Sequence, residues 1–491
     1  MYDAIIIGAG VNGCAVAREL SRKKLNIAVL EKCTDVCEGT SKANSGIAHA
    51  GFDAKPGTLM AKLNVIGSNR MEQLSKELDF PYKRNGSLVL CFDEKDLGKL
   101  EELKERGIKN GVKELQILNR EQILSMEPNI GEKVVAALYA PTAAIICPFG
   151  LTIALAENAA VNGVEFFFRT KVEEIHKKEN GYEILTDNGS FEAKVVINAA
   201  GVYSDEIHNM VCEEEDVFHI TPRKGEYVLY DKKVGNFVSH TLFQLPTALG
   251  KGILVTPTVH GNLLTGPTAE DMEEKEQVDT SSEGLTKVLE KAALSVTQVP
   301  SRQVITSFAG LRAHGPKGDF IIGEVKGAPG FFDVAAMESP GLTCAPAVGE
   351  YVADMVNAYL KPEDKEDFVG TRKGIPSMAL ASKKERQRLI QENPAYANVI
   401  CRCEMVTEGE ILDAIRRPLG ATTTDGVKRR TRAGMGRCQA GFCLPRTVEI
   451  LARELQVDES EILKAGEGSR YLLPKEEAKN ASSLQEGGCR S

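Results

Sequence analysis

The stretch Gly8-Ala9-Gly10-Val11-Asn12-Gly13 decides the fold of the first part of this chain. It follows the apolar, β-rich run at 2–7 and precedes a helical pattern over 15–23, and a second strand over 26–30 ends in Glu31. Glycines at this spacing between a strand and a helix indicate a β-α-β unit that binds a dinucleotide. The first glycine permits a tight turn, the second lets the backbone approach a pyrophosphate, and the third lets helix and strand pack closely.

We expect this turn to hold the phosphates of the dinucleotide. A helix that begins at the glycines presents unbonded backbone N–H groups and the positive end of its dipole to a pyrophosphate. Glu31 stands eighteen residues after Gly13, where an acidic side chain accepts hydrogen bonds from a ribose. The alternative is a glycine-rich turn in a sheet that binds no nucleotide.

Four cysteines near the other end form the second informative pattern. Cys401 and Cys403 read C-x-C, thirty-four residues follow, and Cys438 and Cys443 read C-x-x-x-x-C. Four thiolates from two short loops suit an iron–sulfur cluster, which carries single electrons. A structural zinc ion, which more often uses C-x-x-C pairs, and four reduced thiols without a metal are the alternatives. The spacing favours the cluster.

The bulk composition limits the classes of function. A chain of 491 residues exceeds what one core supports, so two or three domains are expected. A net charge of −9 argues against nucleic acid as the main partner, because phosphate backbones need a concentrated basic face. No apolar run approaches the roughly 20 residues that span a bilayer, and no secretory signal is recognisable. We therefore expect a cytoplasmic protein that meets a membrane only through a partner; the oligomeric state stays open.

Four further segments carry a resemblance to a known family. They are NSGIAHAGFDAKPG at 44–57, VVINAAGVYSD at 195–205, FAGLRAHGPKGDFIIGE at 308–324 and ESPGLTCAPAVG at 338–349. With the glycine turn, they resemble the FAD-dependent oxidoreductases of the D-amino-acid oxidase type, and within them the glycerol-3-phosphate dehydrogenases and L-2-hydroxyglutarate oxidases. The resemblance covers about residues 1–355. Residues 400–445 are similar to the small [2Fe-2S] domain of the bacterioferritin-associated ferredoxins, which is also appended to several FAD dehydrogenases.

The resemblance implies an α/β fold with a Rossmann-like FAD-binding domain interleaved with a mixed-sheet substrate (cap) domain, and a small, mostly helical [2Fe-2S] domain. The oxidoreductase part spans 1–360, with FAD-binding segments at about 1–80, 145–215 and 305–360 and cap segments at about 81–144 and 216–304. Residues 361–398 contain three prolines and little apolar periodicity, which predicts a linker. The cluster domain then spans 399–465, and 466–491 form a flexible tail in which Cys489 is incidental.

The resemblance also assigns the residues that hold the two redox centres. We expect the glycine turn at the pyrophosphate, Glu31 at the ribose, Val172 near the adenine and the turn at 341–343 at the flavin ring. For Val172 the alternative is an ordinary core residue. The predicted FAD contacts are Gly8, Gly10, Gly13, Glu31, Lys32, Thr40, Ser41, Val172, Ala200, Gly201, Gly341, Leu342 and Thr343, and the predicted cluster ligands are Cys401, Cys403, Cys438 and Cys443.

The substrate side is expected to centre on Arg312 and His49. Arg312 matches the family arginine that grips the anionic group of the substrate, because guanidinium offers two parallel donors. His49 is the candidate base for the hydroxyl proton, although it can instead hydrogen-bond the flavin. Lys55 and Glu226 are further candidate contacts with the substrate, but Glu226, like His260 and His314, is more typical of a structural residue.

The resemblance predicts a dehydrogenase that oxidises glycerol 3-phosphate through FAD and passes the electrons through a [2Fe-2S] cluster to a redox partner protein. Phe52 stands where the aerobic glycerol-phosphate enzymes have an arginine, which keeps L-2-hydroxyglutarate open as the substrate; Lys55, Lys62 or Arg223 are candidates to replace the charge. A third alternative is a tail that binds zinc or senses iron. The run at 428–432, KRRTR, predicts a solvated basic loop or a docking site for an acidic partner.

Overall fold

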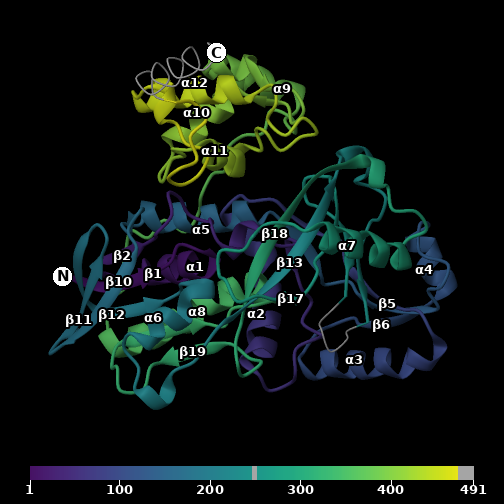
Figure 1. Cartoon of the computed structure of the whole chain (residues 1–491), viewed down its shortest axis with the longest axis horizontal. Helices are drawn as coiled ribbons and strands as arrows, with labels where there is room; N and C mark the ends of the chain where they lie inside the picture. The colour runs from purple at the N-terminus through teal and green to yellow at the C-terminus, as the bar shows by residue number, and fades with distance from the viewer. Residues whose placement is uncertain (246–251, 474–491) are drawn as a thin grey trace, which may run out of the picture. The chain divides into compact units, whose positions relative to one another are not determined.

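The structure, a computed structural model, describes residues 1–245 and 252–473. These residues form two compact units. The first consists of Met1–Lys32 and Val36–Gly374, and the second of Cys33–Asp35 and the chain from Ile375 onward. Both units are drawn in Figure 1.

The first unit is built around a sheet whose central strands are parallel. Its strands run in the order β10-β11-β12-β1-β2-β9, and β20 pairs with β12 and β19 (Figure 1). The pairs β12–β1, β1–β2, β2–β9 and β12–β20 are parallel, whereas β10, β11 and the start of β12 form an antiparallel meander. The strands are β1 Tyr2–Ile7, β2 Ile27–Leu30, β9 Glu165–Phe167, β10 Val172–Lys178, β11 Gly181–Thr186, β12 Gly189–Asn198, β19 Ile321–Glu324 and β20 Phe331–Ala335.

Helices pack closely beside this sheet. The helix α1 contacts α5 and α8, and α2 contacts α8. Gly349 makes the approach of α8 to α1 feasible, because a Cβ at this position would lie 2.7 Å from the backbone oxygen of Ala15. The helices are α1 Val11–Leu20, α2 Leu59–Glu77, α5 Pro148–Val161, α6 Ser204–Asn209 and α8 Gly341–Leu360.

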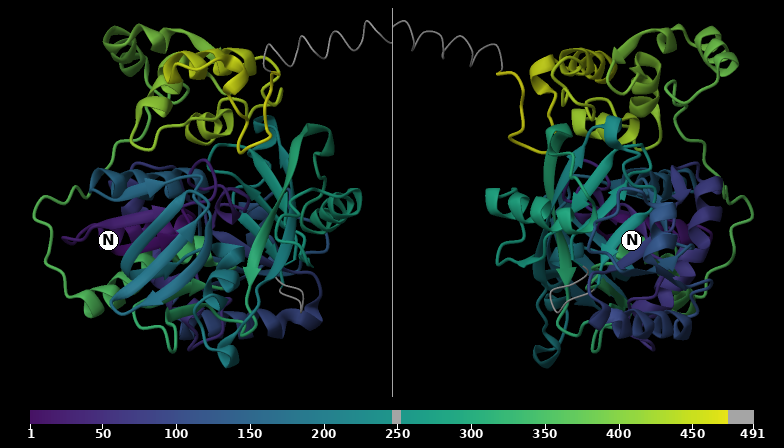
Figure 2. Two further views of the ribbon diagram at one scale, coloured as in Figure 1. Left: turned by 60° about the vertical axis from the view of Figure 1, so that its left-hand side comes forward. Right: turned by 90° about the vertical axis from the view of Figure 1, so that its right-hand side faces the viewer.

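A second, nine-stranded sheet completes the first unit. Its order is β17-β13-β16-β15-β14-β5-β7-β6, and β18 pairs with β13. The helix α7 (Ser282–Ser295) packs on β13, β14, β15 and β16 and covers one face of the sheet (Figure 2). The strands are β5 Ser87–Cys91, β6 Gln116–Asn119, β7 Ala136–Ala140, β13 Thr221–Tyr230, β14 Thr241–Gln244, β15 Leu254–Pro257, β16 Leu263–Gly266, β17 Glu270–Asp271 and β18 Val304–His314, with helices α3 Leu97–Lys109 and α4 Arg120–Met126 in the same part of the chain.

A third, small sheet has the order β3-β8-β4. Its strands are β3 Ile47–Ala48, β4 Tyr82–Arg84 and β8 Ala144–Ile146. The strand β3 ends directly before His49, so its pairing with β8 fixes the start of the segment that carries this residue. The interleaved α/β architecture predicted from the sequence is confirmed.

The second unit is a small helical module. Its elements are α9 Lys383–Glu392, β21 Val399–Cys401, β22 Val406–Thr407, α10 Glu408–Arg416, α11 Thr424–Thr431 and α12 Leu444–Leu455. Its core combines apolar side chains with two of the four cysteines, among them Cys401, Val406, Ile411, Val427, Cys443, Ile450 and Leu451. The segment predicted as a linker contains α9 and the buried residues Leu389 and Tyr396. Of the predicted tail, residues 474–491 lie outside the described residues.

The basic run at 428–432 is helical, so the prediction of a loop is wrong. It forms the end of α11 and its C-cap. Within the second unit, both terminal nitrogens of Arg430 donate to Asp35, at 2.5 and 2.8 Å, and Nη2 of Arg429 donates to the same carboxylate at 2.8 Å. Arg432 Nε donates to Glu404 Oε2 at 2.7 Å. Three of the four basic side chains are therefore committed to carboxylates of their own unit.

His208 of α6 and Asp333 of β20 form a buried pair. This pair predicts that the free energy of unfolding depends on pH. His208 Nδ1 lies 2.6 Å from Asp333 Oδ2, and Nε2 lies 3.2 Å from the backbone oxygen of Asp216. Burial alone lowers the pKa of His208, but the hydrogen bond and charge of Asp333 outweigh it and raise this pKa above the ordinary 6.5. The pair therefore stabilises the fold fully below about pH 6.5, and this contribution is lost as the pH rises through the pKa of the folded state.

We expect urea unfolding of the natural chain to show a larger loss of stability between pH 6 and pH 9 than unfolding of Asp333→Asn. The substitution keeps the size of the side chain and removes the charge that raises the histidine pKa. Equal pH slopes for the two proteins would exclude this pair as the source.

Candidate active site

The glycine turn after β1 has the geometry of a close-approach loop. Gly8 adopts φ +103°, and a Cβ on it would lie 2.6 Å from the backbone oxygen of Ala199. A Cβ on Gly13 would lie 2.0 Å from the oxygen of Gly8 itself. Neither position accepts a side chain, so the turn brings bare backbone to the N-terminus of α1.

Two side chains hold this turn in place. The backbone N–H of Val11 donates to Ser41 Oγ at 2.9 Å, and that of Ala9 donates to Glu31 Oε2 at 2.7 Å. Asn12 Oδ1 lies beside them, buried and with no hydrogen-bond partner among the described residues. The turn thus leads bare backbone into a helix N-terminus, whose N–H groups suit an anionic ligand, while Ser41 and Glu31 fix its shape.

The N-terminus of α8 meets the segment after β3. Thr343 Oγ1 accepts from the backbone N–H of His49 at 3.0 Å and donates to the backbone oxygen of Ile47 at 3.2 Å. The carbonyl of His49 accepts from Asn64 Nδ2 at 2.9 Å. The backbone N–H and carbonyl groups of His49 are therefore both fixed by side chains, Thr343 from α8 and Asn64 from α2.

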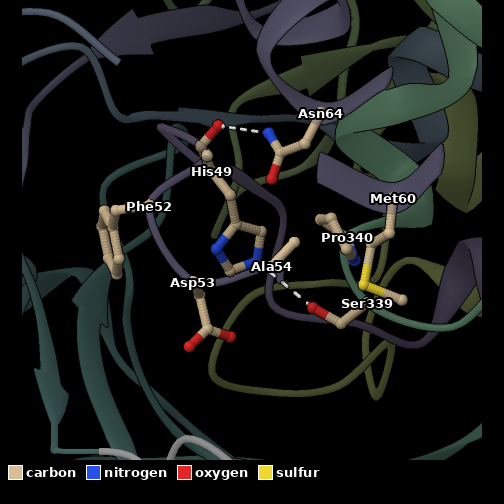
Figure 3. A pocket seen from close by; sticks show the side chains of 9 residues that line it. His49, Phe52, Asp53, Ala54, Met60, Asn64, Ser339 and Pro340 are labelled. Atoms are coloured by element: carbon tan, nitrogen blue, oxygen red, sulfur yellow. Dashed lines mark hydrogen bonds between the residues drawn. The ribbon is translucent and has the colours of Figure 1, made fainter. Parts of the chain in front are cut away.

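The His49 ring projects into a pocket (Figure 3). The pocket encloses about 270 Å³ of space, part of it open to solvent. The ring stacks on Phe243 with centroids 5.7 Å apart, and Nε2 lies 3.5 Å from Ser339 Oγ. The lining residues are His49, Gly51, Phe52, Asp53, Ala54, Met60, Asn64, Ser339 and Pro340. A basic ring nitrogen thus faces a small cavity of mixed polarity.

Arg312 lies on β18, directly opposite Arg223 of β13. Its Nη2 donates to the backbone oxygens of Thr268 and Lys224 at 2.7 and 3.3 Å, and its Nε donates to the oxygen of Arg223 at 3.3 Å. Burial lowers the pKa of the guanidinium, which nevertheless stays charged. Among the described residues no hydrogen bond reaches Nη1, so its two N–H groups remain available to an anion.

The segment 338–341 connects His49 with Arg312. Ser339 contacts the His49 ring, while the charge of the preceding Glu338 acts on Arg312. Glu338 also accepts from His314 Nδ1 at 2.8 Å. The base candidate and the anion-binding candidate therefore flank one short segment, although they come from sequence positions far apart.

The four cysteines of the second unit approach each other in two pairs. Cys403 Sγ and Cys438 Sγ are 3.5 Å apart, and Cys401 and Cys443 are near enough for each thiol to shift the pKa of the other. A hydrogen bond from Cys443 lowers the pKa of the Cys401 thiol despite its burial, and the backbone N–H groups of Gly434 and Glu404 add to this effect. Cys401 is thus the thiol whose thiolate, the form that binds metal, is favoured, whereas the pKa values of Cys403 and Cys443 are raised by burial and by the neighbouring thiols.

The comparisons with known proteins bear on both units. The family model of FAD dependent oxidoreductases matches residues 3–355. The chain belongs to this family. The model of the BFD-like [2Fe-2S] binding domain matches residues 399–453, so the chain also carries that domain.

Three relatives illustrate the similarity. The chain is 52% identical to a glycerol 3-phosphate dehydrogenase of Caloramator mitchellensis over 474 residues, 96% of this chain and 98% of that protein. It is 29% identical to the mitochondrial L-2-hydroxyglutarate dehydrogenase of Caenorhabditis elegans over 55% of this chain and 63% of that protein. Dithionite-reduced L-α-glycerophosphate oxidase of Mycoplasma pneumoniae with FAD bound superimposes with a TM-score of 0.73 at 33% identity, over 77% of this chain and 99% of that one.

The residues of the glycine turn fit the FAD that the family uses. The bare backbone at Gly8 and Gly13 and the N–H groups at the N-terminus of α1 form a cradle for phosphates. The turn that begins α8 lies next to the His49 segment, on the substrate side. The chemistry of the donors in the second unit, four thiols in two pairs, likewise fits an iron–sulfur cluster.

The other predicted FAD contacts lie in loops and at the ends of strands and helices, and their contacts with FAD stay predictions. Lys32 Nζ lies 3.3 Å from the centroid of the Tyr203 ring, and Thr40 Oγ1 donates to the backbone oxygen of Leu311 at 2.6 Å. Val172 begins β10 and packs in the core of the sheet. Ala200 and Gly201 follow the end of β12, and Gly341, Leu342 and Thr343 begin α8.

Glu226 has a structural position rather than one on the substrate side. Strand alternation places it on the face of β13 opposite Arg223 and Arg312. Its side chain is 0% exposed, and its two carboxylate oxygens accept from Ser281, from N–H at 2.9 Å and from Oγ at 3.0 Å. Lys224 Nζ lies 3.6 Å from the same carboxylate. The structure thus does not support a substrate contact, because the residue ties the start of α7 to the sheet.

We expect Glu226→Ala to lower the free energy of unfolding by about 3 kcal/mol, because Lys224 would keep a buried charge without its partner. Urea unfolding followed by fluorescence measures the loss. Glu226→Gln, which keeps an acceptor for Ser281, is the matched control and should lose less, and the FAD content of both variants should equal that of the natural chain. A loss of bound FAD at unchanged stability would contradict the structural role.

The charges proposed to replace the missing arginine lie in different places. Phe52, which stands at that position, is 6% exposed and lines the pocket. Lys55 and Lys62 are exposed, and Lys62 Nζ lies 5.6 Å from the Tyr351 ring centroid. Arg223 pairs with Asp271 through Nε–Oδ1 and Nη2–Oδ2 contacts of 2.6 and 3.1 Å. Arg312 is thus the half-buried cation with donors to spare, and a role for Lys55 stays a prediction.

Sequence reasoning missed the three other polar residues that line the pocket, Ser339, Asp53 and Asn64. Ser339 and Asp53 stand inside segments that carry the family resemblance. The resemblance could therefore have pointed to both residues. Asn64 lies on α2 without any motif. Its contact with the His49 carbonyl exists only because α2 packs against the N-terminus of α8.

No helix in the described part of the chain combines the length and the apolar character that crossing a bilayer requires.

Proposed function

We propose that this chain is an FAD-dependent glycerol 3-phosphate dehydrogenase, which oxidises the secondary alcohol to dihydroxyacetone phosphate and delivers the electrons to a partner protein. The observation that carries this proposal is the 52% identity to a glycerol 3-phosphate dehydrogenase over 96% of the chain, both redox units included. The reaction removes two electrons and two protons from the C2 alcohol, one hydrogen as hydride from carbon and one proton from oxygen. Bound FAD supplies the hydride acceptor.

Arg312 binds the phosphate of the substrate. Its Nε and Nη2 are held by three backbone carbonyls, so the guanidinium is oriented before the substrate arrives. The N–H groups of Nη1 then meet an anionic oxygen without a large loss of side-chain entropy. Because the guanidinium is half-buried, its charge acts in a medium that screens it less than water does.

His49 accepts the proton of the hydroxyl group. Its backbone is fixed by Thr343 and Asn64, and its ring is supported by Phe243. A neutral imidazole carries a basic lone pair, the kind of group that accepts a proton in general-base catalysis. Ser339 stands beside Nε2 and helps to hold the substrate oxygen near it.

The electrons leave through the second unit. An iron–sulfur cluster accepts single electrons, so the two electrons of one turnover leave in two steps and require a one-electron partner protein. Cys401, Cys403, Cys438 and Cys443 are the ligands. The chain thus acts as a dehydrogenase, because the cluster offers an exit other than oxygen.

Anaerobic titration of the purified protein with glycerol 3-phosphate tests this function. We expect bleaching of the flavin band at roughly 450 nm by glycerol 3-phosphate and no bleaching by L-2-hydroxyglutarate. Bleaching by the hydroxy acid alone would reassign Arg312 to carboxylate recognition, the alternative that Phe52 keeps open. Iron and acid-labile sulfide analysis of the same sample distinguishes the cluster from zinc.

A further inference from the structure

Two loops of the second unit present exposed cationic side chains beside the thiols of Cys403 and Cys438. Cys403 is exposed, and its Sγ lies 3.5 Å from that of Cys438. The loops pack closely here, because a Cβ on Gly436 would lie 2.3 Å from the Cβ of Cys403. Arg402 precedes Cys403 and Arg437 precedes Cys438, and both arginines are exposed. One exposed cation therefore stands directly beside each of the two thiols.

The same loops expose two large apolar side chains. Phe442 is 86% exposed and Met405 is 49% exposed. Met405 follows Cys403 by two residues, and Phe442 follows a turn in which the N–H of Gly441 donates to the backbone oxygen of Cys438 at 3.0 Å. A single exposed apolar side chain is ordinary. Aromatic, methionine and arginine side chains gathered on one surface, however, are typical of the centre of a protein–protein interface.

The charge of this region has the opposite sign to that of the whole chain. Residues 399–453 contain ten arginines and lysines against six aspartates and glutamates, whereas the chain contains 60 against 69. Glu404, which follows Cys403 directly, is buried and accepts a hydrogen bond from Arg432. The exposed charges that directly neighbour the two thiols in sequence are therefore both positive, and their complement is an acidic protein surface.

We propose that an acidic one-electron carrier protein docks on the cluster face, which we define as Arg402, Cys403, Met405, Arg437 and Phe442. This inference rests on the proposed function, which sends electrons through the second unit to a partner. Carboxylates of the carrier meet the two arginines and steer its approach, while Phe442 and Met405 exclude water from the centre of the contact. One electron passes from the reduced cluster to the metal of the carrier, which is reduced by one electron while the cluster returns to its oxidised form, and no proton moves.

Binding of zinc-substituted plastocyanin to the full-length holoprotein tests the docking. Plastocyanin is an acidic one-electron carrier, and its zinc form exchanges no electrons, so its Kd does not depend on the potential of the cluster. We expect the double variant R402E/R437E to raise this Kd by about tenfold or more, because it replaces attraction with like-charge repulsion. Phe442→Ala should raise it by about tenfold, the effect of truncating an aromatic side chain at the centre of an interface.

Two matched controls come from the same unit. The variant K383E/K384E makes an equal change of charge at exposed positions of α9, and Leu380→Ala removes an apolar side chain that is 87% exposed. Both should bind zinc-substituted plastocyanin within about twofold of the natural chain, since substitutions away from an interface are near neutral. Equal losses in the variants and their controls would overturn the proposal, as would natural-chain binding of plastocyanin no tighter than that of cytochrome c, a basic carrier.

Stopped-flow absorbance with copper plastocyanin adds a kinetic measurement. Dithionite reduces the cluster without substrate, so a failure here is distinguishable from a failure of the proposed glycerol 3-phosphate activity. We expect reduced R402E/R437E to be oxidised about tenfold more slowly than the natural chain, and with a weaker dependence on ionic strength. Phe442→Ala serves if the double variant does not assemble its cluster. Slower reduction of the cluster by glycerol 3-phosphate, at unchanged oxidation by plastocyanin, would assign the cluster face to the chain's own first unit and refute the proposal.

Discussion

Replacing Arg312 with lysine is expected to lower kcat/KM for glycerol 3-phosphate by about a hundredfold, mostly through KM. A charge-assisted hydrogen bond contributes about 1.5–3 kcal/mol, and lysine cannot keep the backbone contacts of Nε and Nη2 while it also meets the phosphate. Steady-state kinetics with a one-electron dye as acceptor measures the change. The FAD content of the variant should stay unchanged, because the glycine turn lies on other elements.

The matched control is Arg223→Lys. Arg223 lies opposite Arg312 in the same sheet register but is paired with Asp271. We expect kcat/KM of the Arg223→Lys variant to stay within about threefold of the value for the natural chain, because ion pairs of partly exposed residues contribute little to binding or stability. An equal loss in both variants would show that positive charge in general, rather than the donors of Arg312, recognises the substrate.

Replacing His49 with asparagine is expected to lower the rate of flavin reduction by about a thousandfold at saturating substrate, within the range that a general base contributes. Asparagine keeps the backbone contacts with Thr343 and Asn64 and removes the basic nitrogen. Anaerobic stopped-flow absorbance measures the rate. The acidic limb of the pH profile, which reports protonation of the base, should vanish in the variant.

Ser339→Ala is the comparison for this variant. Its hydroxyl lies 3.5 Å from His49 Nε2, so we expect a decrease of about tenfold or less with the acidic limb preserved. If His49→Asn instead altered the flavin spectrum and left both the rate and its pH dependence intact, His49 would be a flavin contact and another group would accept the proton.

The local chemistry of the chain is readable from short stretches. The β-α-β unit at 2–31 follows from apolar alternation and glycine spacing, and these are properties of neighbouring residues. The cysteine spacing likewise indicates an iron–sulfur cluster on its own, and the family resemblance singles out Arg312 and His49. In contrast, the sequence does not say toward which face of its sheet the side chain of Glu226 points. Only the pairing of β13 with β18 and the packing of α7 show that it faces away from Arg312.

By itself, then, the sequence determined the class of the protein and its two redox centres, and it predicted most of the side chains to which we assign the chemistry, because residue type and spacing within a motif are local. The tertiary structure decided which of these side chains meet. It joined Ser339 to His49 across 290 positions, buried two arginines of the basic run on Asp35, and paired each cysteine with one from the other loop. Such contacts depend on how separate strands and helices pack, and packing energy is a sum over residues that no single motif contains.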